Sequence, residues 1–258
     1  MSPLGQHLSR LPVHVKLGKM LIFAAVFGCL DPALTIAAAV GYKSPFVCPF
    51  GKREAADKAR RSFAKADGSD LLGVANAFAA WAKAKSRGAA AEFTRRNFLS
   101  TPALDTLAAM RDDLRKQLGD VGLWSRSRDC NANAHHKQLL KAVVLAGMYP
   151  SVAQLAPPAR SGASPVIKCG GGGAGTTAGT AQVHPSSAVH HRNRASARGY
   201  EYVAFAERVK TPQFSSGTSP SSLPRRCCSL AGASTRSTRL AWSPWTRGSN
   251  CVRPRRRP

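Results

Sequence analysis

The sequence predicts a mainly α-helical bundle at the N-terminal side, followed by a shorter region with strand character and a disordered basic tail. Three observations lead to this division. Apolar residues recur at helical spacing as far as Met148, and a segment whose composition is rich in Pro, Gly, Ser and Thr begins at Ala156. Residues 212–258 contain nine arginines and ten serines but no acidic residue, and no apolar period of either kind.

The net charge of +25 comes from 38 Lys and Arg against 13 Asp and Glu. It is unevenly spread: residues 1–160 carry 23 basic and 11 acidic side chains, whereas residues 161–258 carry 15 and 2. Such an excess favours a polyanionic partner, nucleic acid before a membrane. The seven cysteines form no CxxC pair, so they indicate neither a zinc site nor a disulfide framework, and we expect no metal site. A reducing compartment, cytoplasm or nucleus, is expected.

Residues 20–40 are almost wholly apolar and about as long as a membrane span. Asp31-Pro32 lies in the middle, where a charge costs roughly 2.5–3.5 kcal/mol on insertion scales and proline breaks the helical hydrogen bonds. We therefore expect two buried helices, with Asp31 capping the second and Pro32 at its first position. A secretory signal or a membrane segment, with Lys16 and Lys19 ahead of the apolar run, is the alternative.

Further helices come next along the chain. Residues 52–65 predict a charged helix with a solvated face, and residues 71–81 predict an amphipathic helix whose apolar stripe ends at Trp81. Thr101 is expected to cap the next helix, Pro102 to begin it and Gly119 to end it. The apolar face of this helix consists of Leu107, Met110, Leu114 and Leu118. A last helix is predicted at residues 138–148, and its apolar face consists of Leu139, Leu140, Val143, Val144 and Gly147.

Many short motifs follow one another in a recognisable order along the chain. They include Leu11-Pro12-Val13, Gly18-Lys19-Met20-Leu21-Ile22, Cys29-Leu30-Asp31-Pro32, Lys43-Ser44-Pro45-Phe46, Phe98-Leu99-Ser100, Asn131-Ala132-Asn133-Ala134, Tyr149-Pro150-Ser151-Val152-Ala153 and Val183-His184-Pro185-Ser186-Ser187. This series resembles the C-terminal region of DEAH-box and RNA-helicase-A-type ATP-dependent RNA helicases, which comprises the end of a winged helix, a helicase-associated helical domain and an OB-fold. The family has a short loop where residues 83–96 stand here.

The resemblance implies three parts: residues 1–155 as the end of the winged helix and the ratchet-like helical domain, 156–211 as a partial OB-fold with a Gly-rich loop, and 212–258 as a disordered tail. The fold class is then a mainly α helical bundle followed by a partial, incomplete small β-barrel. The segment from Tyr200 to Thr211 resembles one OB-fold strand and its continuation. The apolar strands that the family places next are missing. When the codons of the tail are read in a shifted frame, they can encode the residues that the family has near the end of its OB-fold. We therefore infer a frame change just after Thr211–Gln213.

No motif for catalysis is present. Neither Gly18-Lys19 nor Gly51-Lys52 completes a phosphate-binding loop, and there is no DEAH tetrapeptide for magnesium. The sequence Gly170 to Gly175 fits GxGxxG, but it has no strand before it and no helix after it. The chain alone is therefore expected to hydrolyse no ATP. ATP and Mg belong to the ATPase domains of the parent helicase.

The resemblance implies that the chain binds RNA, single-stranded, beside those absent ATPase domains and without a membrane partner. Candidate RNA-binding residues by motif are His184, Ser186, Ser187, Lys210 and Thr211. Candidates by charge alone are Lys168, Arg192, Arg194 and Arg198. Two alternatives remain open at this point. The chain could be a stand-alone basic RNA-binding protein without a motor, or a non-functional fragment with no stable fold.

Overall fold

A computed structural model describes most of the helical region and parts of the chain beyond it. The described residues are 2–64, 68–125, 129–156, 166–169, 179–184, 186–189, 202–210 and 226–229. Residues 157–165 and the Gly-rich segment at 170–175 lie outside them. The division of the chain at residues 155 and 211 stays a prediction.

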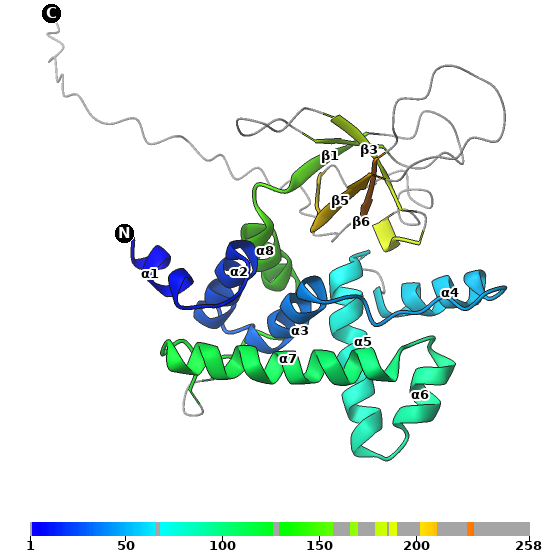
Figure 1. The fold of residues 1–258 in the computed structure, drawn as a ribbon, viewed down its shortest axis with the longest axis horizontal. Coiled ribbons are helices and arrows are strands. Elements are labelled where there is room, and N and C mark those ends of the chain that lie inside the picture. Colours follow the sequence, from blue (N-terminus) through cyan, green and yellow to red (C-terminus); the bar gives the residue numbers. More distant parts are fainter. Residues whose placement is uncertain are drawn as a thin grey trace, which may run out of the picture.

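The described part of the chain forms eight helices, below a group of strands in Figure 1. The helix α7 runs across the side of the bundle that faces away from the strands, and α5 crosses behind it (Figure 1). The helices are α1 (Pro3–Ser9), α2 (Val15–Val26), α3 (Leu30–Gly41), α4 (Arg53–Ala64), α5 (Asp70–Ser86), α6 (Ala90–Arg96), α7 (Thr101–Asp120) and α8 (Lys137–Met148). None of the described helices is long and apolar enough to cross a membrane.

The predicted pair of buried helices is confirmed as α2 and α3, but the predicted cap is wrong. Helix α3 begins at Leu30, and Asp31 lies inside its first turn. The backbone N–H of Asp31 instead donates to Oδ1 of Asn131 at 2.7 Å. The Asp31 carboxylate is thereby free to pair with Arg111 and Arg115 of α7. A cap from so distant a residue leaves no signal in the local sequence.

The segment Cys130–Asn133 closes the turn between α2 and α3. The carbonyl of Cys130 accepts from the Leu30 N–H at 3.1 Å, and the Asn133 N–H donates to the Gly28 carbonyl at 2.8 Å. The Asn133 side chain donates to the Phe27 carbonyl at 2.9 Å. Gly28 has φ +68°, a conformation that glycine adopts without strain. These contacts give the Asn-Ala-Asn-Ala motif a structural role.

Helices α5 and α7 bury the predicted stripes, with small shifts at their ends. Trp81 is 2% exposed, and Leu107, Leu114 and Leu118 are buried. Ser100, rather than Thr101, caps α7 by accepting from the Ala103 N–H. Helix α7 also runs one residue past Gly119. Residues 83–96 form the end of α5 and the short α6 rather than a loop, because Ala, Lys, Glu and Arg are strong helix formers.

Six strands in the described residues form one sheet. They are β1 (Val152–Ala156), β2 (Val166–Cys169), β3 (Gly179–Val183), β4 (Tyr202–Ala204), β5 (Glu207–Lys210) and β6 (Arg226–Ser229). Their order is β4-β1-β2-β3-β6-β5, and every pair is antiparallel except β3 with β6. The two outermost strands, β4 and β5, are joined by Phe205-Ala206. They lie in the stretch from Tyr200 to Thr211, which resembles one OB-fold strand and its continuation.

The strand β6 lies within the predicted tail, and the disorder of the tail as a whole stays a prediction. Its residues 226–229 fall within the stretch expected to be disordered, yet they pair with β3 on one side and β5 on the other. The physical reason is that ladder hydrogen bonds come from the backbone, so a segment without an apolar pattern can fill a gap between two strands. The other residues of 211–258 lie outside the described part of the chain.

Two apolar cores result. The larger one joins α2, α3, α5, α7 and α8, and it includes Ala204 at the end of β4. The smaller one is formed by the sheet and by residues that follow β3 and β4, and contains Ala153, Leu155, Ile167, Val183, Val189, Val203 and Phe205. Lys16 of α2 donates to the Ser151 hydroxyl at 2.6 Å, and the Phe205 N–H donates to the Ser151 carbonyl at 3.0 Å. The sheet is thus fixed to the bundle close to where β1 and β4 meet.

Candidate nucleic-acid interface

The turn after β3 contains three of the candidate RNA-binding residues and is attached to the helical bundle. The Ser187 hydroxyl donates to Oδ2 of Asp70 at 2.6 Å, and the Ala188 N–H donates to Oδ1 of the same carboxylate at 3.0 Å. The Ser187 oxygen also accepts from the Val189 N–H at 3.2 Å. We call this set of contacts between Asp70 and residues 187–189 the Asp70 clasp.

The clasp is buried and paired with a cation. Ser187 is 2% exposed and Asp70 is 8% exposed. Nε of Arg60, on α4, lies 3.5 Å from Oδ1 of Asp70. A buried carboxylate is costly unless it is paired and hydrogen-bonded, and here two donors and a guanidinium meet it. The clasp therefore joins α4, α5 and the turn after β3 in one polar network.

The clasp divides the three candidate residues of the turn into one that is buried and two that a ligand can reach. Ser187 is covered, and its hydroxyl is already used, so it positions the turn in this structure. His184 is exposed and Ser186 is half-buried. The Ser186 N–H donates to Nδ1 of His184 at 3.2 Å, which sets the direction of the ring. When the imidazole is neutral, Nε2 then carries the proton and can donate to a ligand.

The charges that act on His184 are mixed, and the two arginines outweigh the carboxylates of Asp57 and Asp70. Partial burial first, and then the charges of Arg60 and Arg53, lower the pKa of His184 below its ordinary value of 6.5. Both arginines belong to α4, for which the sequence predicts only a solvated helix. Arg53 is exposed and pairs weakly with Asp57, at 3.9 Å. His184, Ser186, Arg53 and Arg60 therefore form one basic, polar surface, which we call the His184 surface.

Two members of this arrangement are missed by sequence reasoning. Asp70 carries no signal of its own, because its partner Ser187 lies 117 residues away. The involvement of α4 has a weak signal. Residues 52–61 contain five basic side chains against two acidic ones, which favours contact with an anion over a neutral solvated face.

The other predicted candidates are placed only in part. Lys168 lies in β2 opposite Gln154 and Thr180, and Lys210 ends β5 opposite Arg226. Nothing is described of these two side chains. Thr211, Arg192, Arg194 and Arg198 lie outside the described residues. Among the residues that are described, no three His, Cys, Asp or Glu side chains gather so as to hold a metal ion.

Comparisons with known proteins agree with the motifs. Residues 14–101 match the family described as "Helicase associated domain (HA2), ratchet-like". The chain is 44% identical over 161 residues to the ATP-dependent DNA/RNA helicase DHX36 of Bos taurus, covering 60% of this chain and 16% of that protein. It is 39% identical over 219 residues to the ATP-dependent RNA helicase DHX29 of Mus musculus, covering 81% of this chain and 15% of that protein.

A plant relative gives the same result. The chain is 36% identical over 213 residues to the DExH-box ATP-dependent RNA helicase DExH1 of Arabidopsis thaliana. The match covers 82% of this chain and 20% of the relative. The chain thus spans no more than about a fifth of the relatives' length. The predicted resemblance to the C-terminal region of DEAH-box helicases is confirmed.

Proposed function

We propose that this chain, similar to the C-terminal region of DEAH-box helicases, is an accessory module that holds single-stranded RNA beside the ATPase domains of a helicase. The ATPase activity, with its ATP and Mg, would belong to those domains. The chain itself would contribute binding and no hydrolysis. The observation that carries the proposal is the His184 surface, a basic patch whose geometry is fixed by the buried Asp70 clasp.

We further propose that the sheet is an OB-fold. Support comes from the strand order, in which β1 pairs with both β2 and β4, and β3 pairs in parallel with β6. If β4 and β5 are the two halves of one bent strand, the order closes on itself as a five-stranded barrel. Such barrels bind single strands by combining cations that track phosphates with groups that meet the bases. In that arrangement Lys168 and Lys210 remain candidates beside the His184 surface.

The chemistry of the His184 surface suits this role. Arg53 and Arg60 can contact phosphates, and Nε2 of His184 and the Ser186 hydroxyl can donate to phosphate, sugar or base oxygens. The lowered pKa of His184 keeps the ring neutral at physiological pH, so its contribution is directional rather than charged. We therefore expect binding with little sequence preference.

The test is the affinity of the full chain for a fluorescent oligouridylate as a function of salt. We expect Arg53→Gln to weaken binding and to reduce the slope of log K against log salt by about 0.7, the value for one phosphate contact on a single strand. Combining it with His184→Gln should weaken binding further. The matched control is Arg95→Gln, which removes one exposed cation from α6. If Arg95→Gln lowers affinity and slope as much as Arg53→Gln does, binding depends on net charge and not on the His184 surface.

A further inference from the structure

A run of exposed apolar residues lies in the loop between α3 and α4. It consists of Val47, Cys48, Pro49 and Phe50, and all four side chains are exposed. Phe50 is fully exposed (106%), more than any other large hydrophobic side chain in the described part of the chain. Consecutive apolar residues in water are unfavourable unless a ligand or a partner covers them. The run therefore indicates a binding contact.

The start of this run is fixed to the bundle. The Val47 N–H donates to the Phe98 carbonyl at 2.9 Å. The ring of Phe46 packs against Phe63 of α4, with the ring centres 6.0 Å apart. The guanidinium carbon of Arg60 lies 5.6 Å from the centre of the Phe46 ring. The residue before the run thus contacts Arg60, a member of the His184 surface.

The end of the run is a tight turn that leads directly into α4. The Lys52 N–H donates to the Pro49 carbonyl at 3.1 Å, and Gly51 has φ +74°, so Phe50 lies at the outer corner of the turn. Arg53, another member of the His184 surface, is the first residue of α4. Because the loop contacts Arg60 before the run and reaches Arg53 after it, Phe50 is a fixed ring at the edge of the His184 surface.

The charges that follow Phe50 nearly balance. Lys52 and Arg53 are exposed, and so is Glu54, whereas Asp57 is half-buried. The contact between Arg53 and Asp57 is 3.9 Å, longer than a hydrogen bond, and the Arg53 side chain is 66% exposed, so its donors can reach a phosphate. Charge alone therefore selects no ligand at this point, and the exposed ring is what a ligand would cover.

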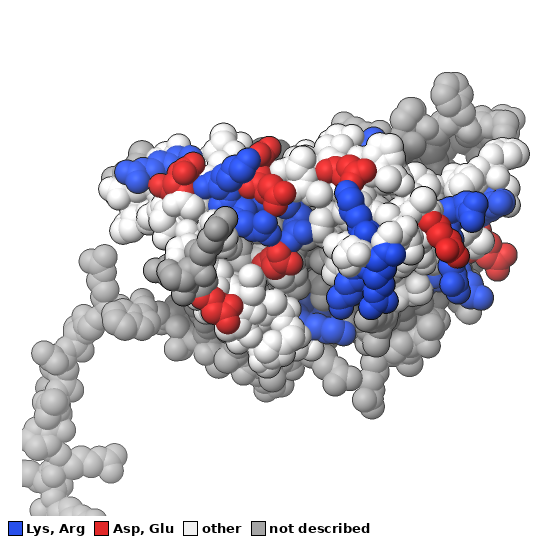
Figure 2. Space-filling view, turned by 90° about the horizontal axis from the view of Figure 1, so that it is seen from below, with Lys and Arg blue, Asp and Glu red and all other residues white. Residues whose placement is uncertain are grey.

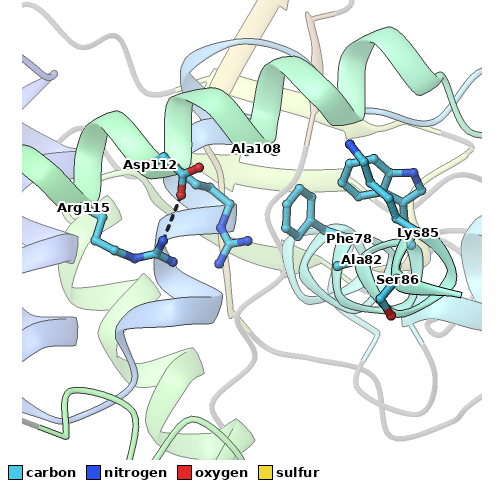
Figure 3. Close-up of a pocket in the computed structure, with 9 residues that line it drawn as sticks. Phe78, Ala82, Lys85, Ser86, Ala108, Asp112 and Arg115 are labelled. Atoms are coloured by element: carbon cyan, nitrogen blue, oxygen red, sulfur yellow. Dashed lines mark hydrogen bonds and ion pairs between the residues drawn. The ribbon is translucent and has the colours of Figure 1, made fainter. Parts of the chain in front are cut away.

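The aromatic rings in the pocket between α5 and α7 offer no such platform. Figure 3 shows Phe78 and Lys85 at this pocket. The Arg111 guanidinium carbon lies 4.4 Å from the centre of the Phe78 ring, Lys85 Nζ lies 4.7 Å from the centre of the Trp81 ring, and both rings are buried. Figure 2, which views the side on which α7 lies, shows acidic and basic side chains interleaved there. That face is less suited to a run of phosphates than the His184 surface is.

We infer that Phe50 is a stacking platform for one base of a single-stranded RNA at the edge of the His184 surface. This inference rests on the proposed function and adds to it the residue that meets a base. The base lies on the Phe50 ring, and the neighbouring phosphates reach Lys52 and Arg53. Single-strand binders combine cations with aromatic platforms in this way, and stacking accepts every base because each has a flat face.

A protein partner fits the run less well. Specific protein interfaces take roughly 20–30 residues from each side, and four consecutive apolar residues are few by comparison. A single ring with both faces free, on a rigid turn and next to cations, matches the size of one base. The base is therefore the occupant that we test.

The test compares the full chain with Phe50→Ala in binding a fluorescent oligouridylate and an abasic oligomer of the same length, each over a range of salt concentrations. We expect Phe50→Ala to bind the oligouridylate about tenfold more weakly, through the loss of one stacked base. The slope of log K against log salt should stay unchanged, because phenylalanine carries no charge. Affinity for the abasic oligomer should be the same for both proteins. Phe50→Trp should keep the affinity for oligouridylate.

The matched control is Val47→Ala, which shortens another exposed side chain of the same run and should leave both affinities unchanged. Phe50 belongs to neither apolar core, so circular dichroism and urea unfolding of Phe50→Ala should match those of the unmodified chain. If the unmodified chain binds oligouridylate and Phe50→Ala binds it equally well, this inference is overturned while the proposed function stands.

Other results would count against more, or against a different part. An unmodified chain that does not bind oligouridylate overturns both the proposed function and the stacking contact. An equal loss for the abasic oligomer would contradict stacking, since no base is present there. Self-association of the unmodified chain in analytical ultracentrifugation, abolished by Phe50→Ala, would assign the run to a second copy of the chain instead.

Discussion

The helical bundle and the sheet are stabilised in different ways. The bundle has a continuous core in which residues far apart in the chain are interleaved: α2 packs against α8, and the segment 130–133 closes the turn before α3. The sheet has a small core among its described side chains, and polar contacts at Asp70 and Ser151 hold it to the bundle. Apolar burial therefore stabilises the bundle, whereas the position of the sheet depends on a few hydrogen bonds and on Ala204, which lies in the core of the bundle. Substitutions in the two regions should differ in size and in what they disturb.

The largest effect is expected for Trp81→Ala in the bundle. Trp81 is 2% exposed and packs against Phe78, so its truncation should lower the free energy of unfolding by about 3–5 kcal/mol, as other large-to-small core changes do. Urea denaturation followed by circular dichroism measures this loss. Tyr149→Ala is the control, since that ring is 65% exposed. A loss below about 1 kcal/mol for Trp81→Ala would place the bundle core elsewhere.

Helices α2 and α8 pack so closely at Gly147 that a side chain at this position should lower the stability of the bundle. A Cβ there would overlap Cβ of Met20 and lie 3.1 Å from the Lys16 carbonyl oxygen. We expect Gly147→Ala to cost about 1–3 kcal/mol through overpacking, measured by thermal and urea unfolding. Gly41→Ala is the matched control, because its added carbon would meet only side-chain atoms at 3.8 and 3.9 Å. Equal stabilities of the two variants would show that α2 and α8 can separate freely.

For the sheet, Ser187→Ala tests the Asp70 clasp. The change removes the donor to Asp70 and the acceptor of the Val189 N–H, so we expect a loss of about 1–2 kcal/mol. Hydrogen exchange should speed up in residues 186–189 and in β3, while α7 and α8 keep their protection. The control is Ser186→Ala, since among the described residues Ser186 contributes to the turn through its backbone N–H and not through its hydroxyl. Uniform loss of protection across the bundle would mean that the two regions unfold as one.

The smallest effect concerns the titration of His184. Its pKa is lowered on folding, so the native state binds fewer protons than the unfolded state does. Its contribution to stability is therefore complete above pH 6.5, the ordinary value, and declines as the pH falls from there toward the lowered pKa. His184→Gln should remove this decline, and Arg53→Gln should raise the pKa that NMR titration measures. A pKa of His184 at or above 6.5 would contradict the placement of Arg53 and Arg60 beside it.

The sequence predicts the bundle better than the contacts that connect its parts. Helices α5, α7 and α8 are predicted because one face of each is apolar, and Trp81, Leu107 and Val144 are buried accordingly. The cap of α3 could not be predicted, because Asn131 supplies it from 100 residues away. The same holds for Ser187, whose motif is visible but whose partner Asp70 is not. A local sequence pattern indicates which face of a segment is buried and where a helix begins. It does not indicate which distant residue supplies the hydrogen-bond partner.

The closure of the α2–α3 turn by Cys130 and Asn133 sets a lower limit on what can fold as a unit. The match to the helicase-associated family ends at residue 101, before α7 is formed and before these two residues. A fragment cut at residue 101 would leave the Leu30 and Asp31 amides and the Phe27 and Gly28 carbonyls without their partners. During synthesis, we expect α2 and α3 to gain these hydrogen bonds only after residue 133 has left the ribosome. The set of residues that these contacts connect is therefore longer than the segment that matches the family.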